Sequence, residues 1–231
     1  MSYIKKLTYS ILPIIRYIVL SYLVIFISYF IFYIFGYRDV SMFINNYGIY
    51  INLIFNIVYI FILSKKYRVR YMFSSKYIYH LLILGVSLSL FLNNIILLIR
   101  SSGDIVNVNK IILMISSVIV GPIIEEIIYR YILISKLRCF NSRISSVIIS
   151  SVIFSLSHNN IYSIIYSLIL GLVLGVIYIR KVSVSNSIIV HSFANLSVLF
   201  IKGFNSYILL LSFILLIISV KILKRDYFIR Q

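Results

Sequence analysis

The stretch Gly121-Pro122-Ile123-Ile124-Glu125-Glu126-Ile127-Ile128-Tyr129-Arg130 places two adjacent carboxylates inside a segment that is otherwise apolar. The chain of 231 residues has only 5 acidic residues, and the other three lie in polar stretches between or beyond the apolar runs. A carboxylate embedded in hydrocarbon costs about 3 kcal/mol on insertion scales and marks a functional site by default. Glu125 and Glu126 are therefore the first candidates for function.

The composition predicts an all-α, polytopic integral membrane helical bundle. The chain is 62% hydrophobic with a mean hydropathy of +1.07, and its apolar runs approach the roughly 20 residues that cross a bilayer. These runs lack the polar alternation of a transmembrane barrel strand. We expect one structural unit in three parts. They are N-terminal transmembrane helices (1–110), a core with the two glutamates (111–201), and a last transmembrane helix with a basic cytoplasmic tail (202–231).

The apolar runs and the charges between them predict about eight spans. The runs are residues 11–35, 43–63, 78–99, 111–134, 144–157, 161–179, 184–201 and 207–223. Alternate connections are basic, so the positive-inside rule places both termini in the cytoplasm and the protein in the plasma membrane. The N-terminal run lacks a small-residue cleavage site, so we expect an uncleaved first span.

The formal charge of +17 is distributed in short clusters at the ends of the apolar runs. This pattern indicates contact with a lipid bilayer and argues against nucleic-acid binding. The single cysteine, Cys139, excludes an intramolecular disulfide and a cysteine metal cluster.

The two glutamates differ in their expected partners. Glu126 and Arg130 are four residues apart on one helix face and can form an ion pair. Glu125 lies about 100° around the helix and has no basic residue at i±3 or i±4. It must therefore protonate, bind a metal, or meet a basic group on another helix. Pro122 is expected to kink this helix beside Glu125.

Two histidines are candidate partners for Glu125. Phe154 and His158 are four residues apart, which sets an aromatic wall beside the imidazole, and His191 shares a helix face with Asn195. Glu125, His158 and His191 could bind a catalytic zinc ion that keeps one position open for water. Without metal, Glu125 and a histidine could activate water while the other histidine and Asn195 stabilise an oxyanion. The motifs HExxH, GxSxG and the Walker phosphate loop are absent from the sequence.

Three motifs occur in order on successive spans: Glu125-Glu126-x-x-x-Arg130, Phe154-x-x-x-His158 and His191-x-x-x-Asn195. Together they closely resemble the CPBP family, the CAAX-protease and bacteriocin-processing intramembrane proteases, also called the Abi family. That family includes the type II CAAX prenyl endopeptidases. The resemblance covers about residues 111–201, and the spans on either side are too generic to compare.

The resemblance implies an intramembrane endopeptidase with a site that opens toward the cytoplasm. Glu125 would activate water with help from His158, and His191 and Asn195 would polarise the scissile carbonyl. Glu126, Arg130 and Phe154 would support the site. The family has been described both as glutamic and as metal-dependent. No cofactor is therefore certain, and Glu125, His158 and His191 would bind Zn only if this member uses metal.

The expected substrate is a peptide or small membrane-associated protein, such as a pheromone, a bacteriocin leader or an anchored small protein in a bacterium. A second hypothesis is a non-proteolytic bacteriocin self-immunity or scaffold protein of the same fold. A third is a small transporter that uses Glu125 and the histidines as a proton relay. The span boundaries place His158 about 20 Å from the cytoplasmic side, deeper than the 10–15 Å of Glu125 and His191. Either residues 144–179 form a short hairpin within the membrane, or these boundaries need to move.

Overall fold

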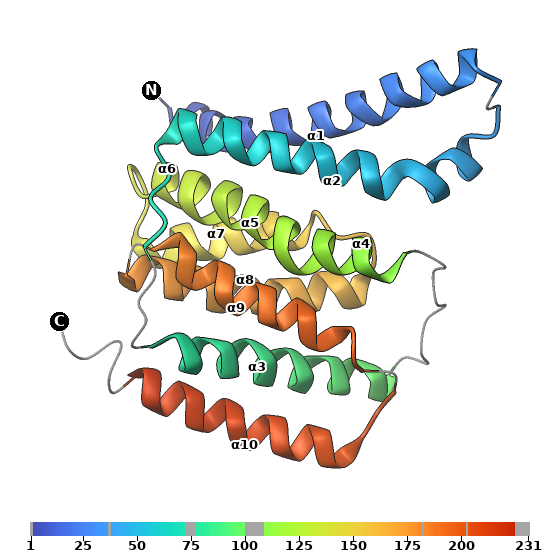
Figure 1. The fold of residues 1–231 in the computed structure, drawn as a ribbon. Helices are drawn as coiled ribbons and strands as arrows, with labels where there is room; N and C mark the ends of the chain where they lie inside the picture. Colours follow the sequence, from blue (N-terminus) through green and yellow to red (C-terminus); the bar gives the residue numbers. More distant parts are fainter. Residues whose placement is uncertain are drawn as a thin grey trace.

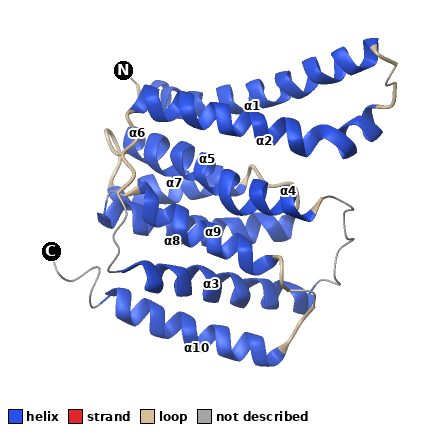
Figure 2. Ribbon diagram, in the orientation of Figure 1, coloured by secondary structure: helices blue, strands red, loops and turns tan. Residues whose placement is uncertain are grey.

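The computed structural model describes residues 2–36, 38–72, 77–99, 109–181, 183–201 and 203–224, and these form a bundle of helices with no strand (Figures 1 and 2). The predicted polar connection around Asp104 and the basic residues 225–231 lie outside the described residues. The helices are α1 (Tyr3–Ile34), α2 (Val40–Tyr67), α3 (Ile78–Ile99), a composite helix from Lys110 to Leu137, α7 (Arg143–Ser155), α8 (Ile161–Lys181), α9 (Val184–Val198) and α10 (Ser206–Leu223).

The polytopic membrane bundle predicted from the sequence is confirmed. Six of the described helices are long and apolar enough to cross a membrane. The other two, α7 with 13 residues and α9 with 15, are shorter than the roughly 20 residues of a full crossing. All of the roughly eight predicted segments are therefore helices of the bundle, but only six of the described helices are long enough to cross a membrane.

The short helices α7 and α9 carry serines that neighbouring helices bury. A serine costs little inside a bundle because its hydroxyl can return to a carbonyl of its own helix, as Ser151 does to Val147 at 2.8 Å. The hairpin of α7 and α8 is also asymmetric, because α8 has 21 residues and α7 only 13. The turn that contains His158 therefore follows α7, a helix that is only about 20 Å long.

The composite helix contains two π-helical segments between its α-helical parts. It consists of α4 (Lys110–Met114), the π-helical segment η2 (Ile115–Val120), α5 (Gly121–Glu125), the π-helical segment η3 (Glu126–Ile134) and α6 (Ser135–Leu137). Wide π turns are frequently found at functional sites. The two glutamates lie where α5 meets η3.

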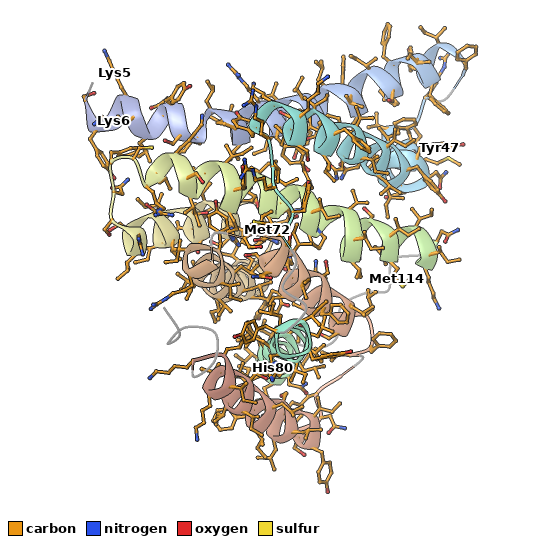
Figure 3. All side chains as sticks on the ribbon, turned by 60° about the vertical axis from the view of Figure 1, so that its left-hand side comes forward. Lys5, Lys6, Tyr47, Met72, His80 and Met114 are labelled. Carbon is orange, nitrogen blue, oxygen red and sulfur yellow. The ribbon has the colours of Figure 1, made fainter. Side chains whose placement is uncertain are left out.

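The helices alternate in direction, and most of the described basic residues lie at one end of the bundle. The start of α1, the ends of α2, α8 and α10, and the connection between α6 and α7 share this end (Figure 1). Lys5 and Lys6 project from it, whereas Met114 lies toward the opposite end (Figure 3). At that opposite end Asp39 caps α2, and the hydroxyl of Ser41 together with the N–H of Met42 holds the pKa of this carboxyl below its usual range.

Close helix contacts position α8 and α9. The pair Gly171 and Gly175, four residues apart, is a helix-packing face as the GxxxG spacing predicts, because a Cβ at Gly175 would lie 2.7 Å from a Val147 methyl group on α7. On the other side of the bundle α9 packs against α3, where the Ser89 hydroxyl donates to the Ala194 carbonyl at 2.8 Å.

Candidate active site

A buried ion pair forms the base of the site. The side chains of Glu126 and Arg130 are both 0% exposed, and Arg130 Nε lies 3.2 Å from Glu126 Oε2, as the spacing of four predicts. The other carboxylate oxygen, Oε1, lies 3.0 Å from His191 Nδ1 on α9. A carboxylate that is paired with a guanidinium presents its oxygens as acceptors, so Nδ1 of His191 is the donor in this contact. Glu126 thus orients the imidazole as well as neutralising Arg130.

Glu125 meets the basic group that its own helix lacks. Its Oε2 lies 3.6 Å from His191 Nε2, and its side chain is 34% exposed while that of His191 is 3% exposed. Since Nδ1 of His191 holds one proton, Nε2 of the neutral ring is the free basic nitrogen, and it faces Glu125. A proton taken up by Glu125 therefore has an acceptor nearby. The two adjacent glutamates bind opposite sides of one imidazole.

Phe154 is the common neighbour of the site residues. Its ring lies edge-on to His158 at 5.1 Å and to His191 at 5.8 Å between centroids, and it also contacts Tyr129. The Arg130 guanidinium lies over the same ring at 4.8 Å from the centroid. The predicted aromatic wall beside His158 is present, and it also supports the second histidine and the buried cation.

His158 lies in the turn after α7, held by the helix end. Its Nδ1 is 3.1 Å from the Phe154 carbonyl oxygen, so Nδ1 donates the proton and Nε2 is left as the basic nitrogen. His158 is close enough to Glu125 to interact electrostatically. Among the described residues no hydrogen bond or ion pair joins the two side chains directly.

Asn195 projects from α9 one turn beyond His191. It contacts the composite helix in η2, whereas His191 contacts it at Glu126 in η3. Its Nδ2 donates to the Ser117 carbonyl in η2 at 2.8 Å. Helix α9 is therefore attached to the composite helix at two points, through His191 beside Glu126 and through Asn195 beside Ser117. The amide has a second N–H, which this hydrogen bond does not use.

The donor set proposed for zinc is only partly assembled. The described residues contain no group of three or more His, Cys, Asp or Glu side chains placed to hold a metal ion. Glu125 and His191 face one another, while His158 contacts the Phe154 ring and forms no hydrogen bond or ion pair with Glu125 among the described residues.

Two residues from the first helices, which the sequence analysis did not identify, also approach the site. The Tyr17 hydroxyl on α1 donates to Asn56 Oδ1 on α2 at 2.9 Å, and Tyr17 is close enough to Glu125 to interact with it electrostatically. Asn56 is 5% exposed in the middle of an apolar run, which is a signal that an inventory of buried polar residues would have found. Tyr17 gave no such signal, because the chain contains 21 tyrosines.

A second missed feature is that side chains bond to carbonyls of both π-helical segments. The Ser150 hydroxyl on α7 donates to the Tyr129 carbonyl in η3 at 2.8 Å, as Asn195 does to Ser117 in η2. Wide turns leave carbonyls available to neighbouring helices. Hydropathy and helical periodicity contain no signal for these bonds.

Comparison with known proteins finds a family match over the segment that contains this site. Residues 107–197, less than half of the chain, match the family model described as type II CAAX prenyl endopeptidase Rce1-like. No curated protein and no solved structure matches the chain. The matched segment includes Glu125, His158, His191 and Asn195. Over residues 107–197 the chain is therefore similar to the Rce1-like type II CAAX prenyl endopeptidases.

Proposed function

We propose that the protein is an intramembrane endopeptidase that hydrolyses a peptide bond in a membrane-associated peptide or small protein. The observation that carries this proposal is the pair of contacts around His191. Glu126 accepts from one ring nitrogen at 3.0 Å, and Glu125 faces the other at 3.6 Å. A carboxylate oriented against an imidazole is the arrangement that general acid–base catalysis requires. The family match supports a protease.

The proposed reaction begins when Glu125, assisted by His158, takes a proton from a water molecule as its oxygen attacks the scissile carbonyl carbon. The carbonyl π electrons move to the oxygen. The proton taken by Glu125 passes to Nε2 of His191, so that this ring nitrogen and Asn195 Nδ2 donate hydrogen bonds to the resulting oxyanion. The intermediate collapses as the same proton returns through Glu125 to the departing amine nitrogen, which breaks the C–N bond. Glu126 stabilises His191 whenever the ring becomes positively charged.

The substitution Glu125→Gln tests this proposal directly. It keeps the shape of the side chain but removes the base, so we expect cleavage to fall below detection while the protein accumulates normally. Cells with wild type or Glu125→Gln at matched protein levels are compared by mass spectrometry of membrane and secreted peptides. Peptides that appear only with wild type identify both the activity and the substrate.

The control for this experiment is Arg143→Ala, because Arg143 is exposed and lies outside the site. Identical peptide profiles for wild type and Glu125→Gln, together with a phenotype that survives the substitution, would contradict proteolysis. That result would favour the immunity or scaffold hypothesis. Loss of cleavage on chelation and its return with Zn would show that Glu125 acts together with a metal.

We also propose that the basic end of the bundle lies in the cytoplasm of a bacterial cell, with both termini on that side. The single cysteine, Cys139, is exposed and unpaired in the connection between α6 and α7, at this end. A membrane-impermeant maleimide should label it only after the cells are opened. A cysteine at Gly203, where a Cβ would meet nothing within 4 Å, in a Cys139→Ser background should be labelled in intact cells. The reverse pattern would invert the topology.

A further inference from the structure

The segment before Glu125 contains a backbone carbonyl that the helix itself cannot satisfy. At the end of η2 the Gly121 N–H donates to the Ser116 carbonyl, five residues back. In this register the donor for the next carbonyl, that of Ser117, would be residue 122. Residue 122 is proline, which has no N–H. The π register and Pro122 together leave the Ser117 carbonyl without its backbone donor.

Asn195 on α9 takes the place of that donor. Its Nδ2 lies 2.8 Å from the Ser117 carbonyl oxygen. A carbonyl oxygen can only accept, so the nitrogen rather than the oxygen of the amide must face it. This hydrogen bond fixes the rotation of the amide group and leaves its second N–H for another acceptor.

We propose that Pro122 is a positioning residue that acts through Asn195: by lacking an N–H it keeps the Ser117 carbonyl free to orient the Asn195 amide for the oxyanion. This inference rests on the proposed peptidase function, because it needs an oxyanion for the second N–H to bind. A backbone N–H at position 122 would compete for the same carbonyl. Asn195 would then rotate freely, and its catalytic contribution would fall although its side chain is intact.

Ser150 provides the comparison that separates positioning from packing. Its hydroxyl makes an equivalent bond, to the Tyr129 carbonyl in η3 at 2.8 Å, and is buried. Among the described residues, no hydrogen bond joins Ser150 or Tyr129 to Asn195. Ser150→Ala should therefore affect stability and should not alter what Asn195 contributes.

The test is a double-mutant cycle in the purified full-length protein, with the substrate identified by the peptide comparison. Removing an oxyanion donor costs about 10²–10³-fold in kcat, so Asn195→Ala should fall in that range. Pro122→Ala should lower kcat about tenfold with little change in KM, because the hydrogen bond from Asn195 to the oxyanion would be poorly oriented but not absent. In the Asn195→Ala background the same Pro122→Ala change should have no further effect, whereas Ser150→Ala should be additive there.

A second readout does not depend on activity. In the ¹⁵N spectrum of selectively labelled protein, the side-chain amide of Asn195 is assigned by its loss in Asn195→Ala. Its signal should shift in Pro122→Ala and stay unchanged in Ser150→Ala. An unshifted signal, or an equal loss of kcat in both backgrounds, would overturn the inference. If wild type cleaves nothing, the peptidase proposal fails, while the amide signal still decides whether Pro122 orients Asn195. If Pro122→Ala does not accumulate, Pro122→Gly replaces it in the same test, because glycine also supplies a backbone N–H at position 122.

Discussion

Arg130→Ala is expected to remove most of the protein from the membrane fraction. The guanidinium is 0% exposed and lies 3.2 Å from Glu126, which is also 0% exposed. Breaking a buried ion pair by removing one partner costs about 3–5 kcal/mol, because an uncompensated charge remains. The substitution also removes the cation above the Phe154 ring, which contacts both histidines. Accumulation of the protein is measured by quantitative immunoblot. The midpoint temperature of unfolding is measured by heating the purified protein in detergent.

Two further variants make this prediction specific to the buried charge. Arg143→Ala removes an exposed arginine and should accumulate like wild type. Adding Glu126→Gln to Arg130→Ala neutralises the orphaned carboxylate, so the double variant should recover part of the lost accumulation while its activity stays low, because His191 loses its charged partner. Normal accumulation and full activity of Arg130→Ala alone would show that the ion pair does not support the site.

Gly85→Ala is expected to have the second-largest effect, although Gly85 is far from the glutamates in the sequence. A Cβ at this buried position of α3 would collide with the Val190 carbonyl oxygen on α9, and backbone cannot move aside as a flexible side chain can. Overpacking of this kind costs about 1–3 kcal/mol or displaces the helix. Val190 directly precedes His191, so a displaced α9 would separate His191 from Glu126. We expect a lower unfolding midpoint together with a loss of activity.

The matched control is Gly48→Ala on α2, where the nearest atom to a new Cβ is a methyl group of Ile44 at 3.4 Å. This change fits the space and improves helix propensity by up to about 1 kcal/mol, so it should leave stability unchanged or raised. If Gly85→Ala behaves like Gly48→Ala in both measurements, the close approach of α3 and α9 does not position His191.

Most of the helices could be predicted from the sequence. The expected run 78–99 coincides with α3, and most other boundaries differ by a few residues. The largest difference is the start of α1 at Tyr3 rather than residue 11, where the Ser2 hydroxyl accepts from the Lys5 N–H and extends the helix. Hydropathy and capping are local properties, so they can be read without the fold. Crossing length was not predicted correctly everywhere, because the runs 144–157 and 184–201 were counted as spans although α7 has only 13 residues and α9 only 15.

The ion pair of Glu126 with Arg130 was also determined locally, because residues four apart on a helix are always neighbours. The same spacing placed Phe154 beside His158, as the edge-on ring contact at 5.1 Å confirms. The sequence further identified Glu125 as a carboxylate without an in-helix partner. It could not say which group on another helix would meet it.

The tertiary structure alone decided which partners meet across helices. It placed His191 between Glu125 and Glu126, directed Asn195 to the Ser117 carbonyl, and brought Tyr17 and Asn56 toward Glu125. The physical reason is that periodicity fixes which face of a helix a residue occupies, but not the sliding and rotation of that helix against its neighbours. Close packing sets those quantities, here through contacts such as Gly85 against Val190, and they appear only when the bundle is assembled.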